Sequence, residues 1–159
     1  MKKLLLALLT LPLLAGFASC SDDDKDLPQV DFEVTVSGGE QNPDDSKIYV
    51  KQGTVFEIES IKPIATNNKN TALGRTVYYL NGIPMFWTIT APFGAKINTA
   101  DMALGEYSLQ IETTVYQESK TMAFAVLSYT LVVEAADAGG TETPGTSVLR
   151  NTIPRIVEN

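Results

Sequence analysis

The chain has 159 residues, and its 12 Lys and Arg side chains are outnumbered by 19 Asp and Glu, so the formal net charge is −7. Nucleic-acid binding relies on Lys and Arg contacts with phosphates, so the acidic balance argues against a nucleic-acid partner. The sequence has no His and a single Cys, which excludes a disulfide within the chain. We therefore expect a folded domain that relies on its apolar core.

Residues 1–19 have the parts of a secretory signal peptide. Lys2 and Lys3 form a short basic region, residues 4–14 are mostly apolar, and small residues precede Cys20. The apolar run is shorter than the about 20 residues that a transmembrane helix needs. Removal of this signal would take away two Lys and no acid, which leaves 10 basic and 19 acidic residues and a net charge of −9.

The sequence Phe17-Ala18-Ser19-Cys20 resembles the lipobox of bacterial lipoproteins. The resemblance implies that the peptide bond before Cys20 is cleaved. It also implies that Cys20 carries the acyl chains, palmitate among them, that hold the protein on the outer membrane. Phe17 departs from the Leu that is most common at its position. Several acyl chains make a durable attachment, whereas one chain holds a protein only marginally. The alternative is an ordinary signal peptide with a chance cysteine.

The four residues Ser21, Asp22, Asp23 and Asp24 follow this cysteine directly. They resemble the export signal that sends lipoproteins of certain Gram-negative bacteria to the outer face of the outer membrane. The resemblance implies a lipid-anchored protein that faces the extracellular side. The alternative is a solvated acidic spacer. With either interpretation, residues 20–28 are expected to form an extended acidic tether.

Residues 29–134 consist of short apolar or alternating stretches separated by turn signals, and none shows the 3.6-residue period of a helix. Asn81-Gly82 is a strong hairpin signal, and the following Pro84 restricts its strand to an edge or a strand start. Residues 65–74 are predicted to be a polar connection. The pattern predicts an all-β, antiparallel sandwich of seven to eight strands. The predicted strands are 30–36, 48–50, 55–59, 76–80, 85–90, 96–99, 107–116 and 121–134.

The domain also carries a series of residues that points to a family: Thr76-Val77-Tyr78-Tyr79-Leu80-Asn81-Gly82, Ala91-Pro92-Phe93 and Leu104-Gly105-Glu106-Tyr107-Ser108-Leu109. The series resembles bacterial immunoglobulin-like domains of the PKD-like kind, with Asn81 in place of the usual Asp. The resemblance implies an immunoglobulin-like sandwich. It also places Tyr107 at a tyrosine corner, where the hydroxyl bonds back to nearby backbone. It carries little information on function, because this sandwich hosts many activities.

The composition changes after residue 134. Residues 135–147 are rich in Ala, Gly, Thr and Asp and are predicted to be a linker. Residues 148–159 regain apolar side chains and form a C-terminal tail. Two interpretations of this tail are open: it docks on the domain or on a partner, or it is disordered, as chain ends commonly are.

No group of residues has the pattern of a catalytic or metal site. The chain lacks His, Cys20 is expected to be acylated, and no Ser lies in an elbow motif. Glu57 and Glu59 share an outward strand face, whereas a glycosidase pair usually comes from different elements in a cleft. Asp44-Asp45 and the acids of 22–26 lack calcium-loop spacing. We therefore predict a protein that is not an enzyme and has no metal and no cofactor.

Aromatic side chains are the remaining functional signal, and Tyr78, Phe86 and Trp87 are the candidate ligand contacts. Phe86 and Trp87 are adjacent on a strand, so one of them is expected to face out, and the same holds for Tyr78 and Tyr79. Outward aromatics can contact sugars or proteins, although single exposed ones are common. The predicted function is a surface-displayed, non-catalytic module that binds a glycan or a surface protein. The alternative is a structural spacer or accessory subunit of a cell-envelope complex.

Overall fold

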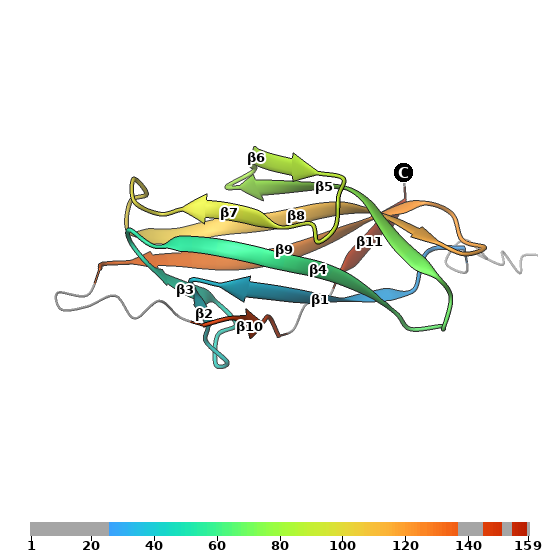
Figure 1. Cartoon of the computed structure of the whole chain (residues 1–159), viewed down its shortest axis with the longest axis horizontal. Coiled ribbons are helices and arrows are strands. Elements are labelled where there is room, and N and C mark those ends of the chain that lie inside the picture. The colour runs from blue at the N-terminus through green and yellow to red at the C-terminus, as the bar shows by residue number, and fades with distance from the viewer. Residues whose placement is uncertain (1–25, 137–144, 151–153, 159) are drawn as a thin grey trace, which may run out of the picture.

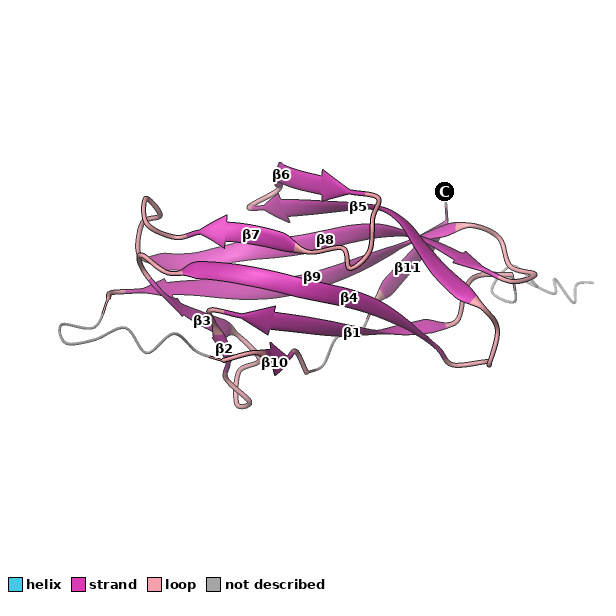
Figure 2. Ribbon diagram, in the orientation of Figure 1, coloured by secondary structure: helices cyan, strands magenta, loops and turns pink. Residues whose placement is uncertain are grey.

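The computed structural model describes residues 26–136, 145–150 and 154–158. These residues form strands and turns, with no helix among them (Figure 2). Accordingly, the described part of the chain has no helix with the length and apolar character needed to cross a membrane. The predicted all-β class is confirmed.

Two sheets lie face to face and form a sandwich (Figure 1). The smaller sheet has the order β10-β1-β4-β7 and the larger one β2-β3-β9-β8-β5-β6, with β11 also paired to β9. All described strand pairs are antiparallel except β3 with β9. The strands are β1 (Val30–Ser37), β2 (Glu40–Gln41), β3 (Ile48–Lys51), β4 (Val55–Ala65), β5 (Thr71–Leu80), β6 (Ile83–Thr88), β7 (Ala95–Asn98), β8 (Gly105–Gln117), β9 (Ala123–Glu134), β10 (Ser147–Val148) and β11 (Arg155–Glu158).

The order of the strands is compatible with an immunoglobulin-like sandwich. In such domains strands A, B and E share one sheet and strands C, F and G share the other. Here β1, β4 and β7 occupy the places of A, B and E, while β5, β8 and β9 occupy those of C, F and G. The predicted bond of Tyr107, which lies near the start of β8, is also confirmed, because its hydroxyl donates to the carbonyl of Ala103 at 2.8 Å.

The core lies between the sheets and is built from the alternating strands. The prediction for 30–36 is confirmed: Val30 and Phe32 are 5% exposed, and Val34 and Val36 are fully buried. On β8 the inward residues follow the predicted alternation as well. They pack with apolar side chains of β3, β4 and β9, and the largest of the fully buried ones are Phe56, Ile48, Ile58, Leu109, Ile111, Leu127 and Leu131.

The hairpin signal at Asn81-Gly82 is confirmed. Both residues have positive φ, 50° and 77°, and they join β5 to β6. Asn81 also fastens the turn to β8, because its side-chain oxygen accepts a hydrogen bond from the backbone N–H of Ser108 at 2.8 Å. The hairpin therefore places β6 at the outer margin of the larger sheet, as Pro84 requires.

Several element boundaries differ from the prediction. The described residues form eleven strands instead of seven to eight, because β2 is added by a short hairpin with β3, and β10 and β11 are added by pairing with β1 and β9. The predicted connection 65–74 is shorter than expected: β4 extends to Ala65 and β5 begins at Thr71, opposite Gln117. The Gln117 side chain holds this end of the sheet together, since its amide donates to Thr71 Oγ1 at 3.0 Å and to the carbonyl of Gln29 at 3.1 Å.

The described residues of the C-terminal tail dock on the domain. β10 pairs with β1, and Leu149, which follows it, is 4% exposed and donates its N–H to the carbonyl of Val34 at 2.9 Å. β11 pairs with β9, and its Ile156 packs against the core. This part of the tail therefore adds a strand to each sheet, which favours the docking interpretation over a frayed end.

Candidate functional site

The largest group of exposed apolar side chains follows β6. Of the described strands, only β5 pairs with β6, so the other edge of β6 has no strand partner in this part of the chain. Figure 1 shows β6 at the margin of the sandwich, beside the end of β5. We call the following five residues the β6 surface, with exposed fractions of 64, 58, 49, 57 and 64%: Ile83, Met85, Phe86, Trp87 and Ile89.

The β6 surface is exposed on both faces of the strand. Phe86 pairs with Tyr78 and so lies on the core-facing side of the sheet, whereas Trp87 pairs with Val77 and lies on the opposite side. Both are about half exposed, because β6 lies at the margin of the larger sheet and neither of its faces is covered. The prediction that one of the two faces out therefore holds for Trp87, and Phe86 is exposed in addition.

Tyr78 is placed differently from the prediction that it contacts a ligand. Its side chain is 2% exposed, and its hydroxyl donates to the carbonyl of Phe93 inside the sandwich. Burial raises the pKa of the Tyr78 hydroxyl, so the group stays protonated and keeps its hydrogen bond. The Tyr78 ring lies 6.1 Å from that of Phe86 between centroids and supports it from the core side. Tyr79, which points to the other face, is only partly exposed.

The positively charged side chain of Arg75 lies over the ring of Trp87, which faces outward. The Arg75 guanidinium carbon lies 5.6 Å from the centre of the Trp87 ring, which is within the range of a cation–π contact. Arg75 comes from β5, next to β6. This contact and the Tyr78–Phe86 contact give both aromatic side chains a support from the neighbouring strand, so the β6 surface is built on ordered elements.

The stretch that forms the β6 surface contains no charged residue of its own. Residues 83–89 read Ile-Pro-Met-Phe-Trp-Thr-Ile. Natural edge strands are usually protected by charged residues, Pro, bulges or a covering element. β6 has Pro84 and a register shift at Tyr78/Tyr79 that leaves Met85 as an extra residue, but it has no charged side chain. An uncharged apolar edge of this kind is typical of a surface that another molecule covers.

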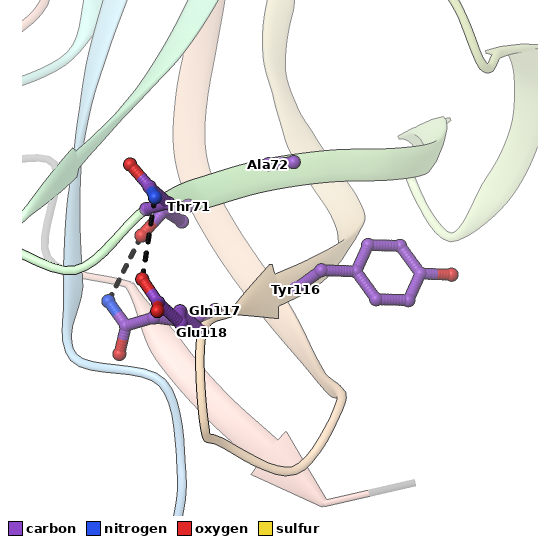
Figure 3. A pocket seen from close by; sticks show the side chains of 6 residues that line it. Thr71, Ala72, Tyr116, Gln117 and Glu118 are labelled. Carbon is purple, nitrogen blue, oxygen red and sulfur yellow. Dashed lines mark hydrogen bonds between the residues drawn. The ribbon is translucent and has the colours of Figure 1, made fainter.

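A shallow hollow of about 400 Å³ lies elsewhere on the larger sheet (Figure 3). Tyr116, which is 49% exposed, forms one side of it. Its ring passes close to Gly74, where a β-carbon would come within 2.8 Å of Tyr116 Cε2. The remaining lining residues are Asn70, Thr71, Ala72, Gln117 and Glu118.

Most polar groups of this hollow bond to one another. Asn70 Nδ2 donates to Glu118 Oε2 at 3.4 Å, and the Gln117 amide nitrogen donates to Thr71 Oγ1 (Figure 3). The Gln117 side-chain oxygen accepts from the backbone N–H of Gln29 and from the Asn67 amide, both at 3.0 Å. The hollow is thus an aromatic ring beside a small polar network, with fewer apolar side chains than the β6 surface.

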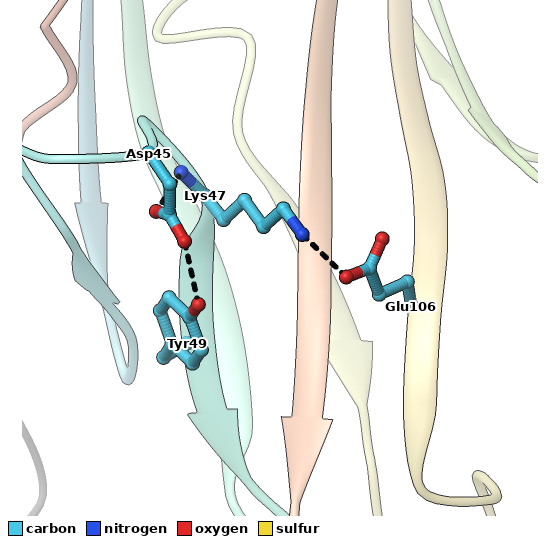
Figure 4. Close-up of polar contacts among 4 residues, drawn as sticks. All are labelled: Asp45, Lys47, Tyr49 and Glu106. Atoms are coloured by element: carbon cyan, nitrogen blue, oxygen red, sulfur yellow. Dashed lines mark hydrogen bonds and ion pairs between the residues drawn. The ribbon is translucent and has the colours of Figure 1, made fainter.

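A polar cluster fastens the turn before β3 to the larger sheet (Figure 4). Hydrogen bonds from the Lys47 backbone N–H and the Tyr49 hydroxyl lower the pKa of Asp45, and the bond to Asp45 raises the pKa of Tyr49. Hydrogen bonding to Glu106 raises the pKa of Lys47. Because β9 lies between β3 and β8, the Lys47–Glu106 contact spans a strand. The cluster is exposed and holds a turn in place.

The two acids considered as a glycosidase pair have structural partners. Glu57 forms an ion pair with Lys96 of the neighbouring strand at 3.0 Å, and Glu59 accepts a hydrogen bond from the Thr146 hydroxyl at 3.1 Å. Across the described residues no group of three His, Cys, Asp or Glu side chains is arranged to hold a metal ion. Through these contacts Glu57 links β4 to β7, and Glu59 links β4 to the segment that precedes β10.

The remaining predicted site residues, Cys20 with Ser21, Asp22, Asp23 and Asp24, lie outside the described residues. Their roles in lipid attachment and export stay predictions.

Three residues of the β6 surface, Ile83, Met85 and Ile89, were not predicted from the sequence. The signal that could have found them is the seven-residue run 83–89 without a charge, directly after a hairpin turn. Tyr116 was predicted to face outward, which is confirmed, but it was not singled out as a contact. Comparisons with known proteins add no family: no protein-family model matches the chain, and the search of curated proteins finds no significant relative.

Proposed function

We propose that this protein is a cell-surface lipoprotein whose PKD-like, immunoglobulin-like sandwich makes a non-catalytic contact with another protein through the β6 surface. The observation that carries the proposal is the cluster of five large apolar side chains, each about half exposed or more, on an edge strand without charged residues and directly after it. Apolar patches of this kind mark interaction sites. An unpaired strand edge also offers backbone groups for strand addition.

The composition of the β6 surface favours a protein over a glycan. The centres of protein interfaces are enriched in aromatic residues and Met and depleted of charge, and Phe86, Trp87 and Met85 fit that description. A sugar needs several side-chain hydrogen-bond partners, and Thr88 is the one hydroxyl residue within 83–89. Glycan contact is therefore the alternative, and the hollow beside Tyr116 supports it better than the β6 surface does.

Display at the cell surface is supported by the lipobox-like sequence before Cys20 and by the acids that follow it. The processed chain would carry a net charge of −9, and such a charge opposes adsorption to anionic lipid. A covalent lipid anchor would hold the protein on the membrane despite this charge, because burial of acyl chains contributes about 0.8 kcal/mol per CH₂. The acidic segment then separates the sandwich from the membrane.

The structural spacer or accessory subunit, the second role considered, has less support. That role would use the C-terminal tail to hold a partner. The described tail residues instead pair with β1 and β9 of their own domain, and Leu149 is buried there. The apolar side chains of the β6 surface stay exposed, and no described strand pairs with the outer edge of β6.

Photo-cross-linking in intact cells tests the proposed contact. We expect a photoreactive amino acid at position 87 to join the full-length protein to another protein chain, because the Trp87 side chain lies in the contact. The matched control is position 104: Leu104 is 56% exposed and Trp87 57%, but Leu104 lies before β8 and outside the β6 surface.

The outcome separates the two classes of partner. Cross-linked protein at position 87 and little at position 104 supports the proposal. Equal yields at the two positions would mean random collisions and would overturn it. A glycan partner would give no cross-linked protein at position 87, and this result would also overturn the protein contact.

A further inference from the structure

We infer that the partner of the β6 surface is a second copy of this chain, which packs its own β6 surface against the first about a two-fold axis. The inference rests on the proposed function, because it names the partner of the same site. In a two-fold contact one patch must be complementary to itself. Three features favour such a contact. They are the absence of charged residues in 83–89, the position of β6 at the edge of the sheet and the exposed apolar area.

Charge is the first of these features. The processed chain would be acidic, with a net charge of −9, so most contacts between two copies would bring like charges together. Residues 83–89 contain no charged side chain. Apart from the Arg75 guanidinium that lies over each Trp87, two copies that meet through this stretch place apolar groups opposite apolar groups. They thereby avoid much of the like-charge repulsion that opposes other approaches.

The position of β6 in the fold is the second feature. Each copy has one exposed β6 edge, so a contact between two β6 edges uses both and closes at two copies instead of growing into a filament. Pro84 lacks a backbone N–H, and the extra residue Met85 interrupts the register with β5. These two features disfavour a long ladder of added strands and leave side-chain packing as the main source of contact.

The area sets the strength of the contact. The five side chains of the β6 surface expose on the order of 500 Å² per copy. Phe86 and Trp87 lie on opposite faces of β6, so a contact through the strand edge buries only part of this area, below about 1,000 Å² for a pair and at the lower limit of specific interfaces. A contact of this size is weak between molecules that diffuse in three dimensions. Tethering on a membrane raises the effective concentration and favours it. A self-contact through the β6 surface therefore suits a protein that is held on a membrane.

Cysteine cross-linking on the full-length, membrane-attached protein tests the inference. Phe86 lies nearly at the middle of the 83–89 run, so in a two-fold contact it lies close to its own copy. We expect Phe86→Cys to form covalent dimers with a short thiol-to-thiol cross-linker, several-fold more than Tyr116→Cys. The Tyr116→Cys control is matched, because both side chains are 49% exposed. The unmodified chain controls for any reaction of Cys20.

Two outcomes would overturn the self-contact. The first is an equal dimer yield for Phe86→Cys and Tyr116→Cys. The second is a high yield that is not lowered when Trp87→Glu is added to Phe86→Cys, since a buried unpaired charge should weaken the contact. If position 87 photo-cross-links to a chain of different mass and Phe86→Cys gives no dimer, the partner is another protein and the proposed function stands. If both experiments fail, both proposals fall.

Discussion

The Gly38→Ala variant is expected to lose about 4 kcal/mol or more of its folding free energy, a loss at the extreme of single substitutions. Gly38 follows β1 directly and has a φ of +74°. A β-carbon there would lie 2.0 Å from the carbonyl oxygen of Val55, the first residue of β4. The clashing atom belongs to backbone, so it cannot move away without disturbing the pairing of the smaller sheet.

Gly53→Ala is the matched control for this effect. Gly53 also has a positive φ, +90°, but no heavy atom lies within 4 Å of a β-carbon built there. Its replacement should cost only the left-handed backbone strain of about 1 kcal/mol. Urea unfolding of both variants measures the difference. Similar losses at the two positions would show that the close approach of Gly38 to Val55 does not exist in the folded protein.

Loss of the proposed lipid anchor is the second large effect that we expect. Cys20→Ala should move the protein from the membrane fraction to the soluble fraction and abolish incorporation of labelled palmitate. The physical reason is that several acyl chains hold a protein durably, whereas an acidic domain without them has no affinity for anionic lipid. Fractionation of cells that express the full-length chain measures the change.

Replacement of Asp22, Asp23 and Asp24 by Ala is the matched control, because it leaves Cys20 in place. This variant should keep its label and its membrane attachment but lose accessibility to protease on whole cells. If it stays accessible, the acids are only a spacer. If Cys20→Ala stays on the membrane, the lipoprotein assignment is wrong.

The regular strands could be predicted because the alternation of apolar and polar residues along them matches the alternation of buried and exposed side chains. The alternation from Val30 to Val36 marks a strand with one buried face, and Asn81-Gly82 supplies two positive-φ residues for a tight hairpin. β2, β10 and β11 have two to four residues each. No alternating pattern marks these segments, and their strand form depends on pairing with β3, β1 and β9.

The candidate site could be predicted only in part, because exposure depends on strand order. Adjacent residues of a strand point to opposite faces, but the sequence does not say which face is covered. For Tyr78 the deciding contact is the carbonyl of Phe93, fifteen residues away. Phe86 is exposed although it is on the core-facing side, since β6 is the outermost strand. Pro84 restricts β6 to an edge or a strand start, but the faces of β6 that stay uncovered depend on the long-range pairing of β5 with β8.

Thiol labelling with a membrane-impermeant maleimide on intact cells tests the central claim, a β6 surface that is displayed outside the cell and covered by a protein. The two variants are Trp87→Cys and Leu104→Cys, at positions of nearly equal exposure, 57 and 56%. We predict that Leu104→Cys reacts readily on cells and that Trp87→Cys reacts several-fold more slowly, while the two react alike in the dilute purified protein. Equal rates on cells, or no reaction of Leu104→Cys there, would contradict the account.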